Sequence, residues 1–78
     1  MAKPTLVNLE TALWVERTGS FSATARKLNA SQPAISGRIR ELEASLNFRI
    51  FTRRGHLMFP TPQGREFLDR IEPHVREI

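Results

Sequence analysis

The amino-acid sequence predicts one mainly α-helical domain that contains a single short β-hairpin. Two observations lead to this prediction. Apolar residues recur at helical spacing in separate segments, and two short strand-like segments flank a turn that contains a glycine. The 78 residues allow one domain, and an apolar share of 40% is enough for a small core.

The first helix is expected between Thr5 and Thr18, where leucines recur at helical spacing. Thr5 and Asn8 are both candidate N-caps, because their side-chain oxygens can accept a hydrogen bond from the first turn. Gly19 is a natural stop, since glycine readily takes the left-handed conformation that ends helices.

A second, short helix is expected from Ser20, which is its N-cap, to Leu28. Phe21 and Ala25 lie on one face of it together with Leu28. A tight turn at Asn29-Ala30 follows and leads directly into the next helix.

The third helix is expected from its N-cap Ser31 to about Leu46, with Asn47 at its end. Pro33 lies in the first turn, where its missing N–H costs nothing. The apolar positions step by four, three and four residues, which defines one buried face made of Ile35, Ile39, Leu42 and Leu46.

A β-hairpin is expected next, with strands over 50–53 and 57–59 and a turn at Arg54-Gly55. Pro60 cannot donate a ladder hydrogen bond, so it is expected to close the hairpin.

The last helix is expected to start at Thr61-Pro62 and to run to residue 78. Its apolar positions step by three, four and three residues, at Leu68, Ile71, Val75 and Ile78. This spacing is typical of a coiled-coil seam. Pro73 interrupts this pattern and is expected to kink or shift the helix near Asp69.

This order of elements, with three helices, a two-stranded wing and a further helix, is that of a winged helix-turn-helix. The DNA major groove is about 12 Å wide, and a helix with its side chains is about 10–12 Å across. The third helix can therefore enter the groove with its N-terminal end towards the bases.

The distribution of charge agrees with an anionic partner. The chain has a formal net charge of +4, and ten of its twelve basic residues are arginines. The segment from Arg17 to Arg54 contains eight basic and two acidic residues, a net charge of +6, whereas the remaining residues have a net charge of −2. The alternative is a merely solvated basic surface. Arginine favours phosphates and base edges because its guanidinium donates hydrogen bonds in pairs.

The start of the third helix carries the candidate groove contacts. Gln32 has the amide pair that matches adenine N6 and N7, and Ser31 and Ser36 are short donors for phosphate or bases. Pro33 and Ala34 are small apolar surfaces that can touch a thymine methyl group. The alternatives are that Ser31 serves only as a cap and that Gln32 is simply solvated.

Five further residues complete the candidate DNA-binding set. Arg38 and Arg40 follow along the helix, and Arg53 and Arg54 flank the hairpin turn, where one of them can reach phosphates or a minor groove. Their alternative role is a surface ion pair. Gly37 costs about 1 kcal/mol in a helix interior relative to alanine, so either the backbone passes close to DNA there or the position is a tolerated weak spot.

The sequence resembles the N-terminal DNA-binding domain of LysR-type transcriptional regulators. The resemblance covers about residues 6–68. It is carried, in order, by Gly19-Ser20-Phe21, Ala25 to Leu28, Ser31-Gln32-Pro33-Ala34-Ile35-Ser36, Ile39-Arg40-Glu41-Leu42-Glu43, Ile50-Phe51-Thr52-Arg53 and Thr61-Pro62-Gln63-Gly64.

The resemblance implies a bacterial transcription factor that binds double-stranded DNA as a homodimer. Residues 1–60 would form the DNA-binding domain, and residues 61–78 would begin a linker and dimerisation helix. A small-molecule effector would bind only to a further domain that is absent from this chain. The candidate partner contacts are Trp14, Phe67, Leu68, Ile71, Val75 and Ile78; for Trp14 the edge of the core is the default and a partner contact is the alternative.

The resemblance also places Gln32, Pro33 and Ser36 at groove-facing positions, Ser31 at a cap and phosphate position, and Arg53 at the wing arginine. This sequence departs from the family where a base-reading arginine often follows Ser36, because Gly37 stands there. It also departs in the wing, which is often rich in arginine and here reads His56-Leu57-Met58-Phe59.

Other classes of function find little support. There is no cysteine, two histidines are too few for a metal cage, and no nucleophile–base pair or phosphate loop is present, so neither an enzyme nor a cofactor is expected. No apolar run approaches the length of a membrane span, and no signal segment begins the chain, so we expect a cytoplasmic protein. The competing hypothesis is a winged helix that binds proteins.

Overall fold

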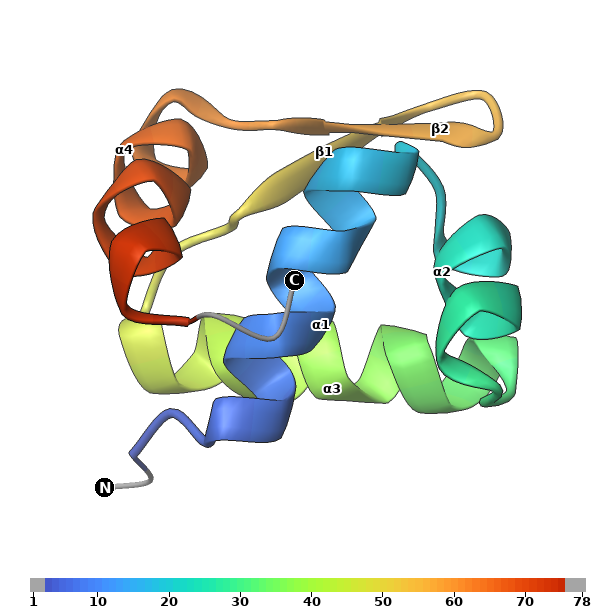
Figure 1. The fold of residues 1–78 in the computed structure, drawn as a ribbon. Helices are drawn as coiled ribbons and strands as arrows, with labels where there is room; N and C mark the ends of the chain where they lie inside the picture. Colours follow the sequence, from blue (N-terminus) through green and yellow to red (C-terminus); the bar gives the residue numbers. More distant parts are fainter. Residues whose placement is uncertain (1–2, 76–78) are drawn as a thin grey trace.

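The computed structural model describes residues 3–75. Its elements follow the expected order: α1 (Leu6–Thr18), α2 (Phe21–Leu28), α3 (Gln32–Leu46), β1 (Phe51–Arg54), β2 (Leu57–Pro60), α4 (Pro62–Ile71) and a 3₁₀ turn, η1 (Glu72–His74). In Figure 1, α1 runs through the middle of the domain, with α2 and α4 on opposite sides of it and the hairpin across one end. The fold is a winged helix-turn-helix.

All four helices begin at a hydroxyl residue whose side chain accepts a hydrogen bond from the backbone N–H three residues later. These N-caps are Thr5, Ser20, Ser31 and Thr61. Thr5 rather than Asn8 is therefore the cap of α1. Asn8 is buried instead, and its amide nitrogen donates to Glu41 Oε1 over 2.7 Å, which joins α1 to α3.

The first three helices end at residues in the left-handed conformation, as the sequence predicts. Gly19 has a φ of 79°, Asn29 of 55° and Asn47 of 65°. Glycine and asparagine tolerate this conformation best, so each helix ends sharply and the chain turns at once into the next element.

One hydrophobic core joins all the helices and the hairpin. Of the expected apolar face of α3, Ile35, Ile39 and Leu42 are buried and Leu46 is partly buried against the core. The rest of the core comes from α1, α2, the hairpin and the C-terminal segment: Ala12, Leu13, Val15, Ala25, Ile50, Phe51, Met58, Leu68 and Val75. This core fixes α3 and the hairpin relative to each other.

The two strands are antiparallel, with Phe51 opposite Pro60 and Arg54 opposite Leu57. Each strand ends one residue later than expected, and Pro60 is the last residue of β2 rather than the residue that follows it. The hairpin is attached to the helices through its backbone, because the Met58 N–H donates to the carbonyl oxygen of Gly19 over 2.8 Å.

The sequence predicts a C-terminal helix that continues past Pro73 with a kink or shift near Asp69, but over the described residues the α-helix ends before this proline. α4 ends at Ile71, and a 3₁₀ turn that contains Pro73 replaces its continuation. Proline has no N–H for the helical ladder and crowds the preceding turn, so the α-helix stops before it.

Two of the four residues expected in the coiled-coil seam face the core of their own chain instead. Leu68 is 1% exposed and Val75 is 6% exposed, because both side chains pack into the core of their own chain. Ile78, the last residue of the predicted seam, lies outside the described residues. Along residues 3–75, no helix combines the length and the apolar character needed to cross a membrane.

Candidate nucleic-acid interface

Residues from α3 and from the hairpin meet in one open hollow at the surface. The hollow has a volume of about 530 Å³ and is lined by Phe21, Gln32, Pro33, Ser36, Arg40 and Arg53. Five of these six residues belong to the predicted DNA-binding set, although they are separated by up to about twenty positions in the sequence. The fold thus brings the start of α3 and the wing arginine to one surface.

The first turn of α3 is exposed to solvent. Ser31, Gln32 and Pro33 are all exposed, whereas Ala34 is half-buried. The hydroxyl of Ser31 accepts from the Ala34 N–H over 3.2 Å, so its cap role is present. The N-terminal end of a helix favours anions, and the exposure of Ser31, Gln32 and Pro33 leaves this end of α3 open to solvent.

Two polar contacts organise the hollow. Arg40 donates from Nη2 to Ser36 Oγ over 3.0 Å, which links two residues one helical turn apart. The guanidinium of Arg53 lies 6.0 Å from the ring centroid of Phe21, a cation–π distance. Both arginines keep most of their donors available for a ligand.

Arg38 does not join this group. Its Nη1 donates to Thr11 Oγ1 over 3.3 Å, and the side chain lines a separate pocket between α1, α2 and α3. Positions 36, 38 and 40 lie alternately on opposite sides of a helix, so Arg38 faces α1 while Ser36 and Arg40 face the hollow. Gly37 is half-buried, and a Cβ added to it would meet no atom within 4 Å.

Arg54 lies at the hairpin turn, outside the hollow. Its guanidinium is 5.4 Å from the ring centroid of Phe59. Phe59 and Leu57 are 41% and 49% exposed, so the outer face of the wing is partly apolar.

Trp14 and Phe67, two of the expected partner-contact residues, lie in different pockets of the described surface. Trp14 is half-buried beside Arg17 and Lys27, whose cationic groups lie 5.1 and 4.9 Å from its ring centroid. Phe67 instead packs edge-on against Phe48, with ring centroids 6.0 Å apart.

Sequence reasoning missed two residues beside the hollow, Glu43 and Arg49. Glu43 Oε2 accepts from the Ile50 and Phe51 N–H groups over 2.7 and 3.4 Å, and Oε1 lies 3.5 Å from Arg49 Nε. Nothing in the local sequence pattern signals this contact, because it depends on how the chain leaves α3.

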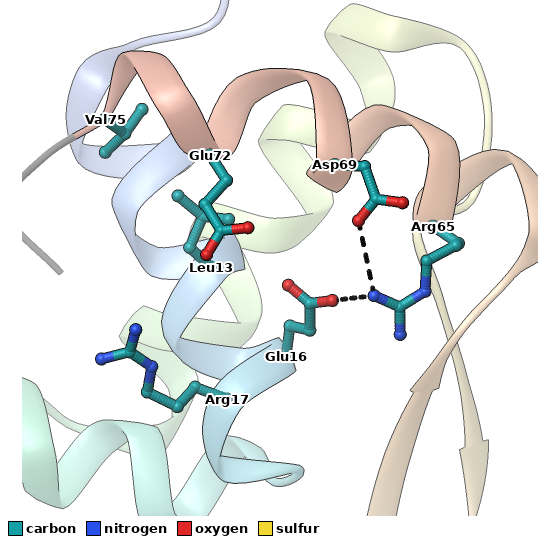
Figure 2. Close-up of a pocket in the computed structure, with 7 residues that line it drawn as sticks. All are labelled: Leu13, Glu16, Arg17, Arg65, Asp69, Glu72 and Val75. Atoms are coloured by element: carbon teal, nitrogen blue, oxygen red, sulfur yellow. Dashed lines mark hydrogen bonds and ion pairs between the residues drawn. The ribbon is translucent and has the colours of Figure 1, made fainter.

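The surface between α1 and α4 has the opposite charge character. A pocket of about 520 Å³ lies there. Figure 2 shows that Arg65 contacts Glu16 and Asp69 in it, with Glu72 nearby. Three carboxylates against Arg65 and Arg17 make this side unfavourable for a polyanion. Among residues 3–75, no group of three acidic or histidine side chains is arranged to hold a metal ion.

A helix-turn-helix with an exposed third-helix start beside an arginine-bearing hairpin defines a winged helix-turn-helix DNA-binding domain. Residues 6–65 match the family described as "Bacterial regulatory helix-turn-helix protein, lysR family". The chain belongs to this family and is a LysR-type DNA-binding domain.

Individual relatives agree with this assignment. The chain is 40% identical to the HTH-type transcriptional regulator AbaB of Streptomyces antibioticus over 70 residues, which are 90% of this chain and 23% of AbaB. An H2O2-bound OxyR mutant of Corynebacterium glutamicum matches with a TM-score of 0.90 and 28% identity over 96% of this chain and 24% of that chain. The DNA-binding domain of CbnR in complex with DNA matches with a TM-score of 0.86 and 27% identity, over 91% of this chain and 82% of that chain. The chain thus spans about a quarter of the full-length relatives.

Proposed function

We propose that this domain binds double-stranded DNA in a sequence-specific manner. The start of α3 enters the major groove, and the hairpin lies against the adjacent backbone and minor groove. The observation that carries the proposal is the single exposed hollow that joins Gln32, Ser36, Arg40 and Arg53. Its amide and hydroxyl groups suit base edges, and its guanidinium groups suit phosphates.

The roles of these residues differ. Gln32 is the candidate adenine reader, and Pro33 and Ala34 offer methyl contacts. Ser31 and Ser36 contact phosphate or base edges, while Arg40, Arg53 and Arg54 supply the charge that binds phosphate. Gly37 allows close approach of the helix to DNA.

We further propose that two copies act together on a dyad-symmetric site, with half-sites about one or two helical turns apart. Phe67 and Ile71 are only half-buried in the single chain, so they remain the candidate contacts on α4. Sedimentation of the protein with and without its operator measures the stoichiometry. A monomer on a dyad-symmetric operator would contradict this part.

The longer protein is proposed to be a cytoplasmic transcriptional regulator. In that protein, residues 1–60 are the DNA-binding domain and residues 61–78 begin the connection to an effector-binding domain. The proposal is supported by relatives about four times as long as this chain.

Selection of bound sequences from random duplexes, followed by a salt titration, tests the DNA-binding proposal. The selected sequences should share a half-site motif, repeated with two-fold symmetry. The logarithm of affinity should fall against the logarithm of salt with a slope of roughly −5 to −9 for a dimer that contacts about 6–10 phosphates. No enriched motif together with a slope near zero would reject the proposal and would favour a protein partner.

A further inference from the structure

A second groove adjoins the hollow and lies between α3 and β1. It has a volume of about 360 Å³, and three arginines line it: Arg40 from α3, Arg49 from the connection between α3 and β1, and Arg53 from β1. Glu43 is the only carboxylate among its lining residues. Three separate chain segments therefore bring positive charge to one place.

The single carboxylate of the groove is already engaged. Glu43 accepts from the Ile50 and Phe51 N–H groups, and its side chain is only 15% exposed. Its second oxygen lies 3.5 Å from Arg49 Nε, whereas the Arg49 side chain is 75% exposed. Glu43 thus contacts Arg49 through the Nε atom of the arginine, and most of the Arg49 side chain remains exposed to solvent.

We propose that this groove binds a backbone phosphate of the DNA strand that runs between the major and the minor groove, with Arg49 as a phosphate ligand. The proposal rests on the proposed function. If α3 occupies the major groove and the hairpin the neighbouring minor groove, the sugar-phosphate strand that separates these grooves must pass between α3 and β1. The guanidinium fork of arginine matches the oxygens of a phosphate.

The first test compares Arg49→Gln with Arg70→Gln on one selected duplex. Both variants lose one positive charge, but Arg70 is an exposed residue of α4 that lines a pocket with Phe48 and Phe67, away from the groove. Loss of one phosphate contact lowers the magnitude of the salt slope by about 0.9 per chain. When salt is raised from about 50 to 200 mM, the affinity of the wild type therefore falls ~3-fold more per chain than the affinity of Arg49→Gln. Arg70→Gln is expected to keep the wild-type slope. Equal slopes for the two variants overturn the proposal.

The second test locates the contact on the DNA. Single phosphates of the duplex are replaced in turn by uncharged methylphosphonate. Replacement between the two grooves is expected to weaken wild-type binding several-fold and to weaken Arg49→Gln binding less, because the variant has already lost the Arg49 contact while Arg40 and Arg53 remain. If the variant loses as much affinity as the wild type at every position, Arg49 contacts no phosphate and the proposal is wrong.

Failure of the phosphate site at Arg49 can be distinguished from failure of DNA binding as a whole. If the wild-type chain shows no binding to any duplex that weakens steeply with salt, DNA binding itself is contradicted. If the wild type binds as expected and Arg53→Gln lowers the slope while Arg49→Gln behaves like Arg70→Gln, only the phosphate site at Arg49 is refuted. Thermal unfolding confirms that each variant is folded.

Discussion

Gly64, in the first turn of α4, packs directly against the backbone of Ile50, the residue before β1. A Cβ at position 64 would overlap the Ile50 carbonyl oxygen and lie 2.8 Å from its carbonyl carbon. The same carbonyl oxygen accepts from the Thr61 N–H over 2.8 Å, so the N-terminal end of α4 is held on the base of the hairpin.

Gly64→Ala is expected to lower the free energy of unfolding by about 1–3 kcal/mol, the usual cost of overpacking a close contact. The contact involves backbone atoms, so a side-chain rotation cannot relieve it. Urea unfolding followed by circular dichroism measures the change.

Gly37→Ala is the matched control, because a Cβ there meets open space. This variant is expected to gain stability, up to about 1 kcal/mol, from the helix propensity of alanine. Equal effects of the two substitutions would show that the approach of Gly64 to Ile50 does not constrain the fold.

Asn8→Ala is expected to destabilise the domain by about 1.5–3 kcal/mol, the range for hydrogen bonds to charged groups. The change removes the buried amide that donates to Glu41 and leaves α1 and α3 without this link. Glu41→Gln is the milder comparison, because its side chain still offers an oxygen acceptor. A shift in the urea midpoint of Asn8→Ala no larger than that of Glu41→Gln would count against the link.

Gln32→Ala is expected to relax base preference at one position of each half-site by about 1–3 kcal/mol. The amide is exposed at the tip of α3, so folding should be unaffected. Selection from a library of random duplexes compares the variant with the wild type. An unchanged preference at every position would remove Gln32 from the residues that read bases.

Arg53→Ala is expected to weaken binding to all duplexes about equally and to lower the salt slope by about 1 per chain, since a phosphate contact carries no sequence information. Titrations of several unrelated duplexes at two salt concentrations provide the measurement. A loss confined to one sequence would instead identify Arg53 as a base-reading residue.

Most of the fold could be predicted from local sequence signals. Ser20, Ser31 and Thr61 are caps whose chemistry acts within three residues, and Gly19 and Asn47 end helices through their own backbone preferences. Signals of this range can be read without knowledge of the tertiary structure.

The features that local sequence patterns do not specify depend on contacts between distant segments. Periodicity identifies Leu68 and Val75 as apolar but does not specify the surface that covers them, and the fold buries them in their own chain. Likewise, Arg38 is drawn to Thr11, 27 residues earlier, and Arg49 is held by Glu43 only because of the path between α3 and β1.

The link between the Met58 N–H and the Gly19 carbonyl has an evolutionary consequence. It joins main chain to main chain, so ordinary side-chain replacements at either position leave both bonding atoms in place. Side-chain replacements at the exposed start of α3 can therefore alter that surface while the hairpin stays attached to the end of α1.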